Sequence, residues 1–299
     1  MKNPNQRYLA DKRIVRIETV LEKLYARYNH RRLIEPDPLQ FVYHYSSRAD
    51  MEIVALLSAV LAYGRVRQIE KSLTGLFARM GNSPFGFVMN FDERARAGLK
   101  NFKHRFTTGD NISDLLALLK IVLGRAGTIE GFFVQGYGSA DKNIIPALSK
   151  FCSSMLRIYI EIFNRKPSRG LRYLLTDPTD RSACKRLNLF LRWMVRDDDV
   201  DTGLWKSIDR AKLIVPVDVH MARLCRILEL YNRKTVSLAS AVEITESFAK
   251  IQPNDPVKYD FALSRIGIVE DCNGKYEPRC NNCELIAFCR EESSLEPSR

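Results

Sequence analysis

Four of the seven cysteines lie close together near the C-terminal end of the sequence, at Cys272, Cys280, Cys283 and Cys289, with the spacing C-x7-C-x2-C-x5-C. Four thiolates from one short segment can form the ligand set of a metal centre. A structural zinc site usually pairs two C-x2-C knuckles across a longer spacer, whereas this segment has one knuckle flanked by single cysteines. The pattern therefore favours a [4Fe-4S] cluster, in which each iron takes one cysteine. Zinc and disulfide bonds are the alternatives.

The residues around these cysteines resemble a known cluster loop. The stretch PRCNNCELIAFCRE, from Pro278 to Glu291, is similar to the loop of endonuclease III-type DNA glycosylases, which belong to the helix-hairpin-helix glycosylase superfamily. The first cysteine interval is one residue shorter in those enzymes, and a surface loop tolerates one inserted residue at little entropic cost. The resemblance implies a [4Fe-4S] cluster on the same four cysteines. We expect Lys275 and Arg279, in the basic part of this loop, to contact DNA phosphates.

Two further stretches resemble the same enzymes in the same order along the chain. VDVHMAR, from Val217 to Arg223, resembles their VDTHVxR segment, whose aspartate is the catalytic carboxylate, so the resemblance assigns that role to Asp218. LLSAV, which ends at Val60, resembles their LLSAQ segment, whose glutamine reaches into the gap left by an extruded base. Valine lacks that hydrogen-bonding amide, so another residue would have to fill the gap. The candidates are Tyr63, Arg65, Arg67 and Gln68, and we expect Arg65 to contact DNA.

Asp218 also has a physical reason to stay ionised. It stands between an extended, proline-containing entry and an amphipathic helix expected from Met221 to Leu230, where it can cap the helix. A capping aspartate accepts backbone N–H groups and lies at the positive end of the helix dipole, and both effects favour the carboxylate. A plain cap is the alternative. We do not expect His220 to be the general base, because the resembling enzymes keep this histidine without a catalytic role.

A nucleophile is implied by the segment CKRLN, from Cys184 to Asn188. Lyase-type members of the superfamily carry Arg-Lys followed by Asn at the same offset, early in the helix after the hairpin, so the resemblance makes Lys185 the amine nucleophile. Arg181 and Arg186 are expected to favour its neutral form and to contact DNA. The hairpin glycines of the family, whose N–H groups meet a phosphate, are absent here. The alternative is a solvated helix face formed by Arg181, Lys185, Asn188 and Arg192.

The elements that must position these residues are helical almost throughout. Apolar residues recur at helical spacing in four long stretches, from Ile14 to Tyr25, Asp50 to Phe77, Ile112 to Leu123 and Ile144 to Phe163. Asp50 is expected to cap the second stretch. No alternating pattern is long enough to build a sheet. The expected fold class is all-α: a helical bundle with a helix-hairpin-helix-like element at 36–215, and a cluster domain at 216–299 on which an N-terminal helix within 1–35 packs.

Two other stretches carry residues that could bind ligands. Residues Phe102 to Phe106 interleave basic and aromatic side chains, which suits phosphate contact and base stacking, with a solvated helix end as the alternative. Residues 197–201 contain four aspartates, and carboxylates two residues apart could bind a divalent metal. A solvated loop is the favoured interpretation of this acidic stretch.

The overall charge points to a polyanionic partner. The chain has 47 Lys and Arg against 35 Asp and Glu, a formal net charge of +12, so nucleic acid is the leading candidate. The N-terminal residues lack the apolar core of a secretion signal, and the apolar runs fall short of the roughly 20 residues that span a bilayer. We expect a cytoplasmic monomer without membrane contact.

These observations predict a base-excision repair glycosylase that acts on double-stranded DNA with a damaged or abasic nucleotide. AP lyase activity would accompany it if Lys185 is the nucleophile, and otherwise Asp218 would activate water. The active site is expected in the cleft between the two parts of the fold, where Lys185 and Asp218 meet. The alternatives are a non-catalytic iron-sulfur protein that binds nucleic acid and a zinc-stabilised helical interaction module.

Overall fold

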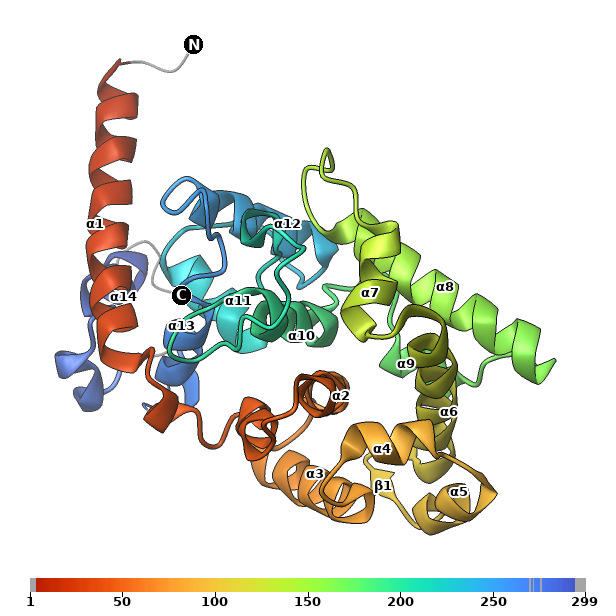
Figure 1. The fold of residues 1–299 in the computed structure, drawn as a ribbon. Helices are drawn as coiled ribbons and strands as arrows, with labels where there is room; N and C mark the ends of the chain where they lie inside the picture. The colour runs from red at the N-terminus through yellow and green to blue at the C-terminus, as the bar shows by residue number, and fades with distance from the viewer. Residues whose placement is uncertain (1–3, 269, 271, 275, 294–299) are drawn as a thin grey trace.

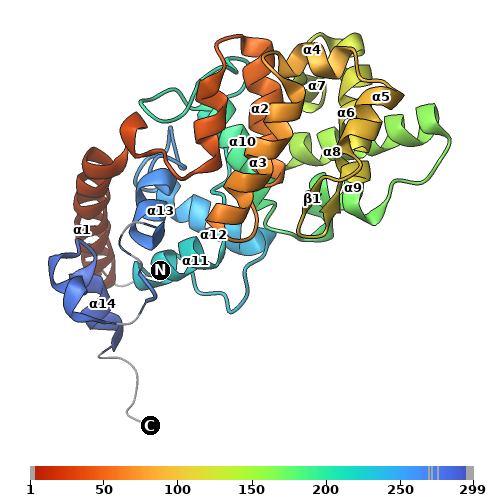
Figure 2. The same cartoon turned by 90° about the horizontal axis from the view of Figure 1, so that it is seen from below.

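The structure, a computed structural model, describes residues 4–268, 270, 272–274 and 276–293. This part of the chain is mostly helical, which confirms the all-α prediction (Figures 1 and 2). No helix within it is long and apolar enough to cross a membrane. The α-helices are α1 (Pro4–Tyr28), α2 (Arg48–Val60), α3 (Val66–Met80), α4 (Pro84–Met89), α5 (Glu93–Leu99), α6 (Gly109–Ala126), α7 (Ile129–Phe133), α8 (Ile145–Phe163), α9 (Arg169–Leu174), α10 (Lys185–Val195), α11 (Val219–Ile227), α12 (Leu238–Ala249), α13 (Asp260–Ile268) and α14 (Ile286–Ser293).

Short elements connect these helices. The 3₁₀-helices are η1 (Arg31–Leu33), η2 (Pro38–His44), η3 (Val134–Gly136), η4 (Pro178–Asp180), η5 (Arg210–Lys212) and η6 (Pro278–Asn282). Strands β1 (Lys103–His104) and β2 (Thr107–Thr108) pair antiparallel in a two-stranded hairpin. Both strands are too short to give an alternating pattern, so the sequence did not predict them.

Helix α2 lies at the centre of the fold because it is apolar on almost every side. Every residue from Glu52 to Val60 is buried, which is the pattern of a helix enclosed by its neighbours. It packs against η2 and α10. Its N-cap is Ser47, and not Asp50 as expected. The carboxylate of Asp50 instead accepts the backbone N–H of Phe85 at 2.8 Å, so it ties the first turn of α2 to α4.

The N-terminal helix packs against the C-terminal part of the chain. Helix α1 runs beside α13 and α14 in both views (Figures 1 and 2). Lys258 Nζ lies 2.7 Å from the Glu22 carboxylate, and the Arg16 guanidinium lies 4.7 Å from the centre of the Phe288 ring. Buried apolar side chains form one continuous core cluster that runs from α1 to α14.

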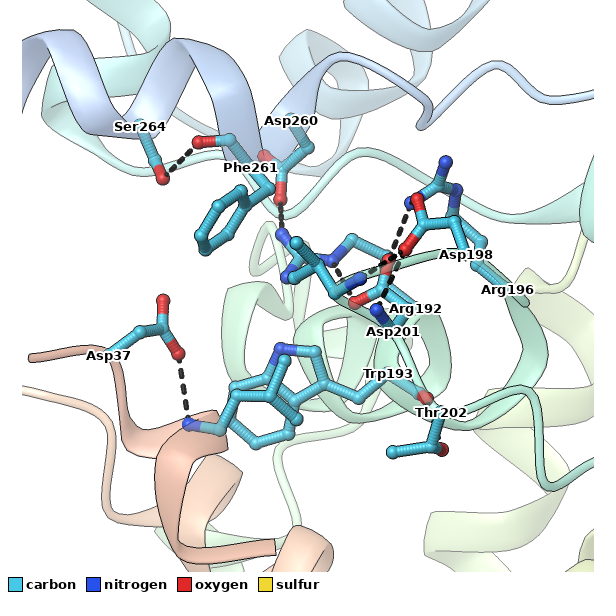
Figure 3. A network of polar contacts seen from close by, with 12 residues as sticks. Asp37, Arg192, Trp193, Arg196, Asp198, Asp201, Thr202, Asp260, Phe261 and Ser264 are labelled. Atoms are coloured by element: carbon cyan, nitrogen blue, oxygen red, sulfur yellow. Dashed lines mark hydrogen bonds and ion pairs between the residues drawn. The ribbon is translucent and has the colours of Figure 1, made fainter. Parts of the chain in front are cut away.

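The loop after α10 carries carboxylates that pair with Arg192 of that helix and with Arg196, its C-cap (Figure 3). Asp201, 1% exposed, accepts from Arg192 Nε at 3.2 Å and from Arg196 Nη1 at 2.5 Å. Arg192 also donates to Asp260 of α13, and Arg196 lies 2.8 Å from Asp198. Burial raises the pKa of Asp201 to about 6, although both arginines oppose the shift.

Two sequence interpretations of this region were therefore wrong. The acidic stretch is not simply a solvated loop, because Asp201 is buried, although Asp197 and Asp199 are exposed. The polar face of α10 is not solvated either, because Asn188 and Arg192 are buried. Carboxylates supplied by the following loop and by α13 neutralise Arg192, which is what allows a guanidinium at this depth.

Candidate active site

Lys185 and Asp218 contact each other. Lys185 is the first residue of α10, and Asp218 immediately precedes α11. The distance from Lys185 Nζ to Asp218 Oδ2 is 2.8 Å, and about a third of each side chain is exposed, 35% and 34%. The structure thus brings together the two residues to which the resemblance assigned catalytic roles, and solvent or a ligand can reach both.

Asp218 is the N-cap of α11, as the sequence predicted. Its Oδ1 atom accepts the backbone N–H groups of His220 at 2.9 Å and Met221 at 2.8 Å, which leaves Oδ2 for Lys185. Burial opposes ionisation of Asp218, but the ion pair with Lys185 and the backbone donors outweigh it and lower the pKa of the carboxyl group. Asp218 is therefore a carboxylate at neutral pH.

A pocket of about 400 Å³ lies next to Lys185. Its volume is within the range of about 300–1,000 Å³ that is usual for small-molecule sites. The segment after α2, helix α9, the segment between α9 and α10, and the start of α10 supply most of its walls. The polar and aromatic side chains of the lining belong to Tyr63, Tyr173, Thr176, Ser182, Lys185 and Arg186.

Arg186 is part of the pocket wall. Its guanidinium lies 4.0 Å from the centre of the Tyr173 ring and donates to the backbone carbonyl groups of Val60, at 2.7 Å, and of Tyr173. Burial lowers the pKa of Arg186. These hydrogen bonds engage part of the guanidinium, and a phosphate contact by Arg186 stays a prediction. In this structure Arg186 joins the end of α2 to α9.

The segment between α9 and α10 makes its turns without glycine. Arg181, with φ 60°, and Cys184, with φ 47°, adopt the left-handed conformation that glycine adopts readily. For other residues this conformation costs about 1–2 kcal/mol each. The Cys184 side chain is buried, while Arg181 is exposed and its carbonyl group accepts the N–H of Leu238 at 3.1 Å. The missing glycines therefore strain this turn and do not prevent it.

The residues that the sequence predicts to contact DNA differ in their exposure, and some lie outside the described residues. Val60 is completely buried and cannot enter a duplex. Arg65, at the N-cap of α3, is exposed, as are Arg67 and Gln68, so a phosphate contact by Arg65 stays a prediction. Lys275 lies outside the described residues, and so does the side chain of Arg279.

The basic and aromatic stretch at residues 102–106 forms the β1–β2 hairpin, and not a helix end. His104 is completely buried, and its ring nitrogens lie 2.9 Å from Ser72 Oγ and 3.0 Å from the carbonyl oxygen of Tyr63. Burial lowers the pKa of His104. Phe106, in contrast, is 56% exposed and stacks on Tyr63. Sequence reasoning missed Tyr173, which lies between this hairpin and Arg186, because a single tyrosine in a short helix carries no local signal.

Each of the four C-terminal cysteines is partly buried. Burial raises the pKa of the Cys283 thiol. Within the described part of the chain, no group of three or more His, Cys, Asp or Glu is arranged as a metal site. As a donor set, the four thiols suit iron or zinc.

A family described as "Protein of unknown function (DUF2400)" matches residues 37–269. The chain belongs to this DUF2400 family. No curated protein and no solved structure matches it. The DUF2400 region begins at the N-cap of η2 and contains the Lys185–Asp218 pair and the neighbouring pocket, whereas the four cysteines lie beyond its end. The family description assigns no activity, so the chemistry of the site must be argued from its geometry.

Proposed function

We propose that this protein is a DNA base-excision glycosylase with AP lyase activity, in which Lys185 is the nucleophile and Asp218 its carboxylate partner. The 2.8 Å contact between Lys185 Nζ and Asp218 Oδ2, beside a pocket of about 400 Å³, carries the proposal. A pocket-lining amine paired with a carboxylate supplies the groups that a Schiff-base reaction at a sugar carbon needs. The net charge of +12 supports a polyanionic substrate, which we take to be double-stranded DNA.

In the proposed reaction, a nucleotide leaves the duplex and its base enters the pocket, because a base inside the stack is out of reach. The Lys185 amine must first lose a proton, and Asp218 Oδ2 is placed to accept it. The lone pair of the amine then attacks the anomeric carbon while the bond to the base breaks. The bonding electrons leave with the base, which is protonated as it departs. Opening of the sugar ring gives an imine, from which loss of the C2′ proton expels the 3′ phosphate.

We further propose that Cys272, Cys280, Cys283 and Cys289 hold a [4Fe-4S] cluster. Such a cluster would act as a covalent crosslink that fixes the loop between α13 and α14, and no step of the reaction above needs its electrons. Iron and sulfide analysis and a visible spectrum of anaerobically purified protein would test this. A colourless protein with one zinc per chain would support the zinc-stabilised interaction module instead.

Borohydride trapping tests the reaction itself. The protein is incubated with DNA duplexes that carry different damaged or abasic nucleotides, together with sodium borohydride, which reduces an imine to a stable amine. A covalent protein–DNA product is expected with the wild type and with Lys206→Ala, and none with Lys185→Ala. Lys206 is a matched control, because it also pairs with an aspartate, Asp197, at 2.7 Å, but it is 67% exposed and does not line the pocket.

The same panel separates the remaining functions. Base release without trapping, abolished by Asp218→Asn and retained by Lys185→Ala, would indicate a glycosylase in which Asp218 activates water. DNA binding without any reaction across the panel would favour the non-catalytic iron-sulfur protein. We propose that the protein acts as a cytoplasmic monomer, and sedimentation of the free protein and of its DNA complex would test the monomeric state.

A further inference from the structure

One exposed aromatic side chain next to the pocket has no role in the proposed reaction. Phe106 lies in the turn between β1 and β2 and is 56% exposed. The preceding residue, Arg105, has φ 55°, a conformation that is costly outside glycine. A phenylalanine exposed on a turn of this kind does not contribute to the core, and a ligand that covered its ring would remove this apolar surface from water.

The ring of Phe106 is held in a fixed orientation by two tyrosines that line the pocket. It stacks on Tyr63, with ring centres 5.0 Å apart and planes at 26°, and meets Tyr173 edge-on at 4.8 Å. Tyr63 is itself anchored, because its hydroxyl group donates to the carbonyl oxygen of His104 at 3.0 Å. A ring supported in this way loses little side-chain entropy when a planar ligand covers it.

The hairpin also packs closely on the segment after α2. A side chain at Gly64, where φ is 102°, would bring its first carbon within 2.8 Å of Arg105 Cδ. The backbone conformation requires glycine at this position, and a side chain there would also displace the Arg105 side chain. The turn of the β1–β2 hairpin thus contacts the segment after α2. Phe106 lies beside the pocket that Lys185 lines.

The charge around Phe106 indicates the chemistry of the ligand. Lys103 and Arg105 flank it in the hairpin and are exposed, and Arg65 adjoins Gly64 and is also exposed. Neither 61–69 nor 102–108 contains an acidic residue. A planar aromatic surface bordered by cations is the combination with which proteins bind unpaired nucleotides, since the ring stacks on a base and the cations contact phosphates.

We propose that Phe106, supported by Tyr63 and Tyr173, is a stacking platform for one unpaired base at the entrance of the Lys185 pocket. The platform deepens the proposed function, on which it rests for the identity of its ligand, by stating that the site binds nucleic acid with an unpaired nucleotide in preference to a fully paired duplex. It needs neither a lesion nor the Lys185 amine. A base held here would be the extruded nucleotide or a neighbour of it.

Fluorescence anisotropy with lesion-free oligonucleotides tests the platform. One probe is a labelled single strand and the other is the fully paired duplex of the same sequence. Stacking on an aromatic side chain contributes about 1–3 kcal/mol per base, so Phe106→Ala should weaken single-strand binding roughly tenfold. Duplex binding should change less than about twofold. Phe106→Trp should bind the single strand like the wild type, and Phe106→Leu should resemble the alanine variant.

Ile160→Ala is the matched control, because Ile160 is 46% exposed on α8 and is not part of the pocket lining. Each variant is first shown to melt like the wild type. Equal single-strand affinities for Phe106→Ala and the control would overturn the platform, and so would wild-type affinity in Phe106→Leu. If the platform is overturned but Lys185-dependent borohydride trapping is still observed, the glycosylase proposal stands. Phe106-dependent binding without any trapping would leave the platform intact and overturn the lyase.

Discussion

Replacing Arg192 with methionine should destabilise the protein strongly. Arg192 lies two turns after Lys185 on α10, is 1% exposed, and pairs with Asp201 of the following loop and with Asp260 of α13 (Figure 3). It therefore ties the helix that begins with Lys185 to the helix that precedes the cysteine segment. Methionine has a similar length and no charge, so the substitution removes the cation and leaves most of the packing.

The expected cost follows from the two carboxylates that lose this partner. Removing one member of a buried ion pair costs about 3–5 kcal/mol, because the remaining charge stays buried without compensation. Asp201 keeps its ion pair with Arg196, so we expect a loss of unfolding free energy at the lower end of this range, about 3 kcal/mol. Burial already raises the pKa of Asp260, and with Arg192 absent its carboxylate would lose a charge that opposes this shift.

Urea denaturation followed by circular dichroism measures this loss as a lower transition midpoint with an unchanged slope. The melting temperature should fall by about 6–12 °C. Arg157→Met is the control, because Arg157 on α8 is 65% exposed and pairs with Glu161 at only 3.8 Å, so its loss should cost less than about 0.5 kcal/mol. An Arg192→Met variant within about 1 kcal/mol of the wild type would refute the argument that this buried network holds α10 in place.

Three further predictions concern other parts of the site. The folded-state pKa of Asp201, about 6, exceeds its ordinary value of 3.8, so protonation favours the folded state: this stabilisation is complete below about pH 3.8 and is lost as the pH rises through about 6. Asp201→Asn should therefore flatten the fall in unfolding free energy between about pH 4 and 6 relative to the wild type, and an unchanged slope would contradict this. Arg181→Gly should relieve the left-handed backbone and raise the unfolding free energy by about 1 kcal/mol while it weakens DNA binding, and a lower melting temperature would exclude strain at this residue. Cys283→Ser should reduce bound iron and visible absorbance in anaerobically purified protein, whereas full iron content would remove Cys283 from the ligand set.

Local sequence signals predicted the helical class and several individual features. Apolar spacing anticipated α8 within a residue of its observed start, and an aspartate between an extended entry and an amphipathic stretch anticipated the cap at Asp218. These signals succeed because helix periodicity and capping depend on residues within a few positions of one another. The prediction that Asp50 caps a helix was wrong because such signals consider only neighbouring residues. The N–H group that Asp50 accepts belongs to Phe85, in a segment distant in the sequence.

The resemblance, and not local pattern, pointed to Lys185 and Asp218 as a pair, and only the tertiary structure shows their atoms in contact. The tertiary structure also determined which arginines are buried and what they contact. Arg186 and Arg192 are both arginines of one amphipathic stretch, yet one is stacked on Tyr173 and the other is buried among aspartates. Whether a charge is buried depends on partners supplied by segments far away in the chain. The sequence determined the helices and the thiol spacing, and packing determined which charges line the pocket and which hold it together.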